Sequence, residues 1–381
     1  MKHEQHSKLT KPDKGFYGRN EISILGSNCH RIQTLASGIG NQLQGEFSVA
    51  YVDADHASHT DNEKGSPSVA FTKNFINKIT HHQLNVYPSV SKYEQDAFFN
   101  SSQLILINGN HEKANHQIVM IDKKKEASLI KRKEALTNVI ALVRTDHEDE
   151  QIPEYIKDLI PKYAELPVFL LTDEKEIGGF VKKLVENRTP KIQGLILGGG
   201  KSTRMGVDKV FMKYHGVSQH TYLQEILSPF CEDVFVSCRP DQASLFPDAI
   251  TDSFLGLGAY GGLLSAFQKN PDSAWFSIAC DIPLLNKETL EALVSKRNPS
   301  KVATCFYNSE TDFPEPLITI WEPRAYAVLL HYLSLGYSCP RKVLINSDVE
   351  IVKLDNEDVL LNANTSKERD KVLELLSKTI S

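Results

Sequence analysis

Cysteine, tryptophan and methionine are scarce in this sequence. Its 381 residues include six cysteines, two tryptophans and four methionines, and no two cysteines form a CxxC pair. This spacing gives no sign of a zinc site or a disulfide framework, so we expect reduced and mostly buried thiols. No apolar run approaches the ~20 residues that span a bilayer, and the first residues lack the apolar segment of a signal peptide. We therefore expect a cytoplasmic protein that does not enter a membrane.

An excess of positive charge is also absent. The formal net charge is −5, which argues against a broad nucleic-acid interface but leaves room for a local basic pocket. The apolar fraction of 41% and the charged fraction of 24% are ordinary for globular proteins. The length is too great for one ordinary core and favours two domains.

What the sequence does contain is a strand that breaks into glycines and then into cations. An apolar, β-branched run at residues 192–197 predicts a buried strand, and Gly198, Gly199 and Gly200 follow it directly. Lys201, Arg204 and Lys209 come next. Glycines let backbone amides approach phosphate oxygens closely, and the cations neutralise the charge. The pattern predicts a loop that binds a nucleotide triphosphate.

Strands and helices alternate on both sides of a linker at residues 186–190. In the first half, strands at 21–25 and 47–52 flank a helix at 29–43, which forms a βαβ unit with parallel strands. Residues 71–79 are predicted as a weak helix. A second alternating series begins at residue 192. We therefore predict two three-layer α/β domains, at residues 1–188 and 189–381.

The first strand–turn–helix lacks the chemistry of a P-loop. Arg31 and Ile32 occupy the positions where a P-loop has its second glycine and its lysine. The nearby cluster of Asp53, Asp55, His56 and His59 either holds a divalent metal or caps helices and faces water. The sequence leaves both readings open.

In the second half, several polar residues follow predicted strands. Asp281 comes directly after an apolar strand at 274–279, where a carboxylate can hold Mg²⁺ against phosphates or simply cap the next helix. Ser237 and Asp252 also follow strands, and the carboxyl ends of neighbouring strands converge. A second glycine-rich segment, at 256–262, either faces a base or sugar or forms a plain turn.

These residues resemble the signature of the molybdenum cofactor guanylyltransferases, which have a Rossmann-like nucleotidyltransferase fold of the GT-A type. The similarity covers residues 191–381 and rests on the loop pattern LxxGGxSxRMGxDK, on residues 258–266, 280–283, 314–317 and 362–365, and on Asp252. It implies transfer of GMP from GTP to molybdopterin with release of pyrophosphate.

The resemblance also assigns roles. It implies that GTP contacts Leu197, Gly198, Gly199 and Lys209, that Asp252 binds the nucleotide and that Asp281 binds Mg²⁺. Ser237 stands where the family usually has asparagine beside guanine and ribose. The run Gly258-Ala259-Tyr260-Gly261 replaces the usual GPLAG, a change that could alter base preference.

We expect catalysis by positioning and charge neutralisation, with Arg204, Lys209 and Asp281 as the catalytic residues. Gly200 and Lys201 complete the phosphate loop, where Lys201 and Arg204 would hold the outer phosphates and Lys209 the α-phosphoryl group. The alternatives are transfer from another nucleotide such as CTP to a sugar or alcohol phosphate, and a non-catalytic, nucleotide-binding cofactor chaperone.

The first half resembles, more distantly, the molybdopterin-guanine dinucleotide adapter proteins, which carry a P-loop. The missing P-loop lysine favours a degenerate P-loop-like domain that docks partners, such as molybdoenzymes or other proteins of cofactor biosynthesis.

Overall fold

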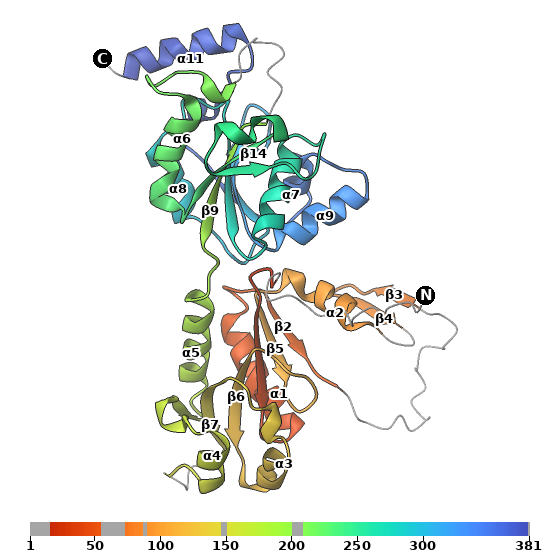
Figure 1. The fold of residues 1–381 in the computed structure, drawn as a ribbon. Coiled ribbons are helices and arrows are strands. Elements are labelled where there is room, and N and C mark those ends of the chain that lie inside the picture. The colour runs from red at the N-terminus through yellow and green to blue at the C-terminus, as the bar shows by residue number, and fades with distance from the viewer. Residues whose placement is uncertain (1–15, 55–72, 87–89, 146–150, 200–208, 380–381) are drawn as a thin grey trace, which may run out of the picture. The chain divides into compact units, whose positions relative to one another are not determined.

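The computed structural model describes residues 16–54, 73–86, 90–145, 151–199 and 209–379. The chain divides into two units (Figure 1). The N-terminal unit is Arg19–Asn187, and the C-terminal unit is Arg188–Ser381 together with residues 16–18. Among the described residues, no helix is both long and apolar enough to cross a membrane.

The N-terminal unit is built on a six-stranded parallel sheet with the order β2-β5-β1-β6-β7-β8. Its strands are β1 (Asn20–Leu25), β2 (Val49–Val52), β5 (Leu104–Asn108), β6 (His116–Ile121), β7 (Val139–Arg144) and β8 (Val168–Leu170). The predicted βαβ unit is confirmed, although β5 inserts between β1 and β2.

Helices cover both faces of this sheet (Figure 1). The helices are α1 (Cys29–Leu43), α2 (Lys92–Phe98), α3 (Glu126–Ile130), α4 (Glu154–Leu159) and α5 (Glu174–Glu186). The apolar face of α1 packs with α5 on one side of the sheet, whereas α3 and α4 pack on the other. The buried residues of α1 are the five that its helical spacing singles out, namely Ile32, Leu35, Ala36, Ile39 and Leu43.

The helix predicted at residues 71–79 is wrong. The described part of this segment is β3 (Lys73–Asn77), which pairs in antiparallel fashion with β4 (His82–Val86). Phe75 lies opposite Leu84 in this ladder, and both side chains are exposed. The run KNFIN holds an aromatic and a β-branched residue and no strong helix former except lysine, so cross-strand pairing decides its conformation.

The C-terminal unit has a seven-stranded sheet with the order β11-β10-β9-β12-β14-β13-β15. Its strands are β9 (Ile192–Leu197), β10 (Val234–Cys238), β11 (Ala249–Thr251), β12 (Ala274–Ala279), β13 (Ala303–Asn308), β14 (Phe313–Trp321) and β15 (Val349–Val352). β9 to β12 are mutually parallel, and β14 runs antiparallel to both of its neighbours.

This sheet also lies between two helical layers (Figure 1). The helices of the unit are α6 (Gln219–Leu227), α7 (Ala259–Lys269), α8 (Lys287–Ser295), α9 (Ala325–Ser334), α10 (Pro340–Ile345) and α11 (Ser366–Thr379). One core cluster joins α6 and α8 to the sheet, and another joins α7, α9 and α10. The α/β class predicted for both halves of the chain is confirmed.

Candidate active site

The chain crosses from one side of β9 to the other, and this crossing marks a ligand-binding edge. After β9 the chain adds β10 and β11 on one side and then returns to place β12 on the opposite side. Leu197 and Ala279, the last residues of β9 and β12, are register partners. In open α/β sheets, ligands bind beyond the carboxyl ends of the strands at such a switch point. The glycine loop and Cys280-Asp281 begin here, side by side.

The first part of the glycine loop fits tightly between β9 and β10. The Gly198 amide donates to the Ser237 carbonyl at 2.9 Å, and a Cβ at Gly198 would lie 2.9 Å from the Val210 side chain. The Gly199 carbonyl accepts a hydrogen bond from Arg239 Nη1 at 3.2 Å. Only glycine fits at Gly198 without displacing Val210. Gly200, Lys201 and Arg204 lie outside the described residues, so their predicted roles stay predictions.

Lys209 and Asp281 meet at the centre of this edge. Lys209 Nζ donates to Asp281 Oδ2 at 3.0 Å and also to Asn364 Oδ1. The two charged side chains are 23% and 16% exposed, so the pair is screened less than a surface ion pair. The backbone carbonyl of Asp281 accepts from the Ala363 amide at 2.8 Å, which ties the 362–364 segment to β12. The structure thus brings together three residues singled out in the sequence.

Asp281 also offers a free oxygen. Its Oδ1 atom is buried and has no hydrogen-bond partner in the described part of the chain. A buried carboxylate oxygen without a partner carries a desolvation cost that a cation would relieve. No group of three or more metal-ligating side chains occurs among the described residues. Mg²⁺ needs only one or two protein carboxylates when phosphates supply the other ligands, so Asp281 fits this ion.

Ser237 and Asp252 form a pair behind the glycine loop. Ser237 is 2% exposed, and its hydroxyl donates to Asp252 Oδ1 at 2.9 Å. Burial raises the pKa of Asp252, while this hydrogen bond and the charge of Arg239 lower it. A Cβ at Gly262 would lie 2.4 Å from the Ser237 hydroxyl, so α7 can approach only because it has glycine there. In this arrangement Ser237 orients Asp252.

The second glycine-rich segment forms the entrance to α7. Gly256 and Gly258 adopt positive φ angles of 79° and 58°, which favour glycine. Tyr260 is fully buried, and its hydroxyl donates to the Leu329 carbonyl at 2.6 Å. The tyrosine that distinguishes this chain from the GPLAG pattern therefore packs into the core between α7 and α9.

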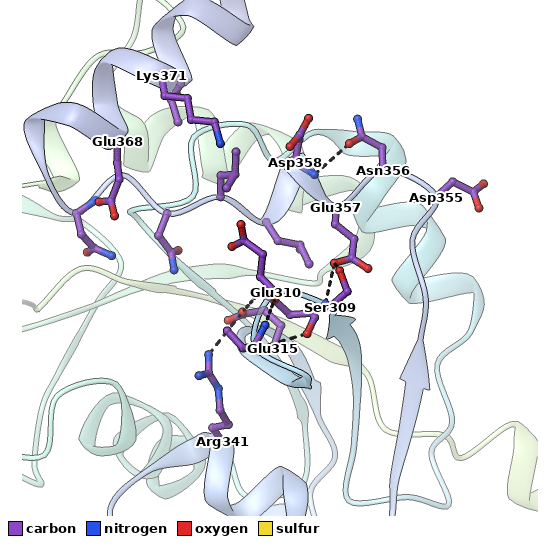
Figure 2. Close-up of a pocket in the computed structure, with 17 residues that line it drawn as sticks. Ser309, Glu310, Glu315, Arg341, Asp355, Asn356, Glu357, Asp358, Glu368 and Lys371 are labelled. Carbon is purple, nitrogen blue, oxygen red and sulfur yellow. Dashed lines mark hydrogen bonds and ion pairs between the residues drawn. The ribbon is translucent and has the colours of Figure 1, made fainter.

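A cavity of about 620 Å³ adjoins the Lys209 group, with Asn364 belonging to both. It lies among the β13–β14 turn, residues 355–364 and α11, and Figure 2 shows Arg341 and Lys371 approaching it from opposite sides. Six carboxylates line it: Glu310, Glu315, Asp355, Glu357, Asp358 and Glu368. Sequence reasoning did not find this cavity, because its lining comes from separate turns. The only part of its lining that the sequence analysis singled out was the 362–365 segment, through the family resemblance.

Three of these carboxylates are used by the local fold. Glu315 accepts from the Leu317 amide and from Asn308, and burial raises its pKa. Glu357 accepts from the amide and hydroxyl of Ser309. Glu368 accepts from the Asn364 and Thr365 amides, and its own amide donates to the Thr365 hydroxyl, which forms a capping box at the start of α11. These bonds fix the wall of the cavity, in which the six carboxylates outnumber the two cations, Arg341 and Lys371.

In the N-terminal unit, the turn between β1 and α1 occupies the place that the glycine loop has after β9, and a buried carboxylate binds its polar side chains. Asp122, buried after β6, accepts from the Ser27 hydroxyl at 2.6 Å and from Arg31 at 3.2 Å. Asp53 accepts from Tyr51 and Asn108. Asp55, His56 and His59 lie outside the described residues, so the suggested metal site stays a hypothesis.

Comparison with known proteins identifies one domain. Residues 194–350 match the family model of the MobA-like NTP transferase domain, so the C-terminal half contains such a domain. A molybdenum cofactor biosynthesis bifunctional protein of Synechocystis is 34% identical over 190 residues, which cover 49% of this chain and 54% of that protein. The chain thus spans about half the length of this relative. A probable molybdenum cofactor guanylyltransferase of Carboxydothermus hydrogenoformans is 28% identical over 190 residues, which cover 48% of this chain and 95% of that protein.

Two solved structures each resemble about half of the chain. The molybdopterin-guanine dinucleotide biosynthesis protein A of Archaeoglobus fulgidus is 21% identical, with a TM-score of 0.42, and the match covers 49% of this chain and 99% of that one. A MobB protein homolog of Bacillus stearothermophilus is 16% identical, with a TM-score of 0.31, and covers 44% of this chain and 98% of that one.

Proposed function

We propose that the C-terminal unit is a nucleotidyltransferase that transfers GMP from GTP to molybdopterin and releases pyrophosphate. One observation carries this proposal: Lys209, Asp281 and Asn364 form a hydrogen-bonded group between the glycine loop and the adjoining cavity. A transferase needs a donor site and an acceptor site on the two sides of its reacting centre. The MobA-like domain and the names of its relatives support guanylyl transfer as the reaction.

The triphosphate belongs on the side of the glycine loop. Amides of this loop and the cations that follow it supply the positive charge that phosphate oxygens require. Asp252 and Arg239 stand at the ends of the neighbouring strands and border the same loop. Asp281 would hold Mg²⁺, which neutralises charge on the phosphates when it is bound.

The acceptor belongs in the cavity. The carboxylate-rich wall repels a polyanion such as a triphosphate, but it accepts hydrogen bonds from an uncharged heterocycle rich in N–H groups. The 2-amino-4-oxo edge of a pterin has this donor pattern. The acceptor's phosphate would then point towards Lys209 and away from the acidic wall.

The chemistry requires little beyond positioning. The acceptor phosphate is already an anion, so it attacks the α-phosphorus in line with departing pyrophosphate without a general base. Charge grows on the α-phosphoryl oxygens in the transition state. Lys209 is held by Asp281 and Asn364 and can stabilise that charge without reorganising.

Pyrophosphate release tests the proposal. The full chain is incubated with Mg²⁺, molybdopterin and each of GTP, CTP, ATP and UTP in turn, and pyrophosphate is measured enzymatically. We expect release with GTP that depends on molybdopterin. Preference for CTP would assign a different nucleotidyltransferase activity, and GTP binding without release under all conditions would support a non-catalytic chaperone.

A further inference from the structure

Three reactive side chains from separate elements meet in the N-terminal unit. Cys29 is the first residue of α1, His111 follows β5, and Asp53 follows β2. Cys29 Sγ lies 3.4 Å from His111 Nε2, and the same nitrogen lies 3.8 Å from Asp53 Oδ1. An imidazole in contact with a thiol can take its proton, and a carboxylate near the same imidazole stabilises the protonated ring. The C-terminal reaction proposed above does not use this group.

The Cys29 thiol is accessible, unlike most cysteines of the chain. No disulfide joins any two of the six cysteines, and only Cys29 and Cys339 are exposed. Burial raises the pKa of Cys231 and of Cys305 to about 12, so these thiols stay protonated and unreactive. Cys339 is exposed like Cys29, but no imidazole of the described residues forms a hydrogen bond with it, so it serves as a comparison within the same molecule.

The surrounding structure fixes the geometry of the group. Asp53 is anchored by the Tyr51 hydroxyl at 2.7 Å and by Asn108 at 2.8 Å. The neighbouring Asn110 amide donates to the Ser27 carbonyl at 2.9 Å and holds the turn before α1. Cys29 also lies in the first turn of a 15-residue helix, whose amino end favours a negative charge.

We propose that Cys29 is a nucleophilic thiol that undergoes thiol–disulfide exchange with low-molecular-weight disulfides. His111 Nε2 takes the proton from Sγ, and the Asp53 carboxylate stabilises the resulting imidazolium. The thiolate attacks one sulfur of the disulfide, a new S–S bond forms at Cys29, and the old S–S bond breaks. The departing thiolate then takes up the proton, so one disulfide and one thiol give one mixed disulfide and one thiol.

Glutathione disulfide provides the test on the intact full-length chain. The protein is exposed to it at neutral pH, quenched at intervals by acid and digested, and the modified fractions of Cys29 and Cys339 are measured by mass spectrometry. We expect Cys29 to react at least about tenfold faster than Cys339, which is a conservative bound below the roughly 100-fold lower end of what a positioned general base contributes. In His111→Asn, which cannot accept the proton, the rate of Cys29 should fall about tenfold while that of Cys339 is unchanged.

One control and two possible outcomes decide whether the folded geometry activates Cys29. In guanidinium chloride both cysteines should react at similar rates, because the folded geometry is lost. Equal rates of Cys29 and Cys339 in the native wild-type protein would overturn the proposal without any variant. A His111→Asn variant that keeps its circular dichroism spectrum and the fast rate of Cys29 would overturn the role of the imidazole.

Discussion

Replacing Asp281 with asparagine should separate catalysis from stability. The substitution removes one negative charge and keeps the size of the side chain. The amide oxygen can still accept from Lys209, and the backbone bond from Ala363 to residue 281 does not involve the side chain. The fold around the site should therefore persist. What disappears is the carboxylate oxygen Oδ1, which is buried and has no hydrogen-bond partner among the described residues.

The expected effect of Asp281→Asn on stability is much smaller than its effect on kcat. Losing the partly exposed ion pair costs about 1 kcal/mol or less, and removing a partly buried negative charge offsets part of that cost. Stability should thus change by less than about 1 kcal/mol, or roughly 2–4 °C in Tm. A carboxylate that holds Mg²⁺ against the phosphates contributes much more in the transition state. We expect kcat to fall by about 100- to 1000-fold, equivalent to about 3–4 kcal/mol.

The assay compares Asp281→Asn with a matched variant at the other end of the same strand. Asp272 precedes β12, and its carboxylate accepts from the backbone amides of Phe16 and Tyr17. Asp272→Asn should leave pyrophosphate release unchanged. Release is measured with GTP, molybdopterin and a Mg²⁺ titration, and thermal unfolding is followed on the same samples. Turnover of Asp281→Asn within threefold of wild type at saturating Mg²⁺ would refute the metal assignment.

Three further predictions follow from the C-terminal unit. Gly262→Ala should displace the Ser237 hydroxyl from Asp252. We expect KM for GTP, measured from initial rates, to rise by at least about tenfold, and the free energy of unfolding in urea to fall by about 1–3 kcal/mol. Ser237→Ala should raise the pKa of Asp252 further above its usual value and move the acidic limb of the pH profile of kcat/KM to higher pH. Because the folded protein then holds this proton more tightly than the unfolded chain, the free energy of unfolding should fall as the pH rises through the raised pKa. Arg297→Ala should cost about 3–5 kcal/mol in urea unfolding, because it removes two bonds, of 2.7 and 2.9 Å, from the fully buried Glu322.

The sequence predicted the site best where the residues of the site directly follow an apolar strand. The run from residue 192 to Gly199 has the apolar strand and the glycines in one continuous stretch, so both the strand and the loop could be predicted. Asp281 follows β12 in the same way. The contact between Lys209 and Asp281 could only be expected in outline, because it requires β9 and β12 to be neighbours, and the order of strands in a sheet is a tertiary property.

The cavity shows what sequence reasoning could not reach. Its lining residues come from turns and helix ends spread over residues 308–372, and none of them forms a pattern with a period. Arg341 lies on a six-residue helix that was not predicted, since a helix this short has no periodic signal. Tyr260 shows that a departure from the family pattern does not by itself locate a side chain. The departure suggested an effect on nucleotide base preference, yet the side chain of Tyr260 is buried in the core.

The two strand–turn–helix openings of this chain differ in what occupies the anion position. In the C-terminal unit we propose that the glycine loop and the cations that follow it receive an external phosphate. In the N-terminal unit the buried carboxylate of Asp122 accepts from Ser27 and Arg31, so the donors that could hold a phosphate already hold an internal anion. A phosphate placed there would meet the negative charge of Asp122 and would have to break both bonds. The internal contacts of Asp122 with Ser27 and Arg31 therefore argue against phosphate binding at the N-terminal turn.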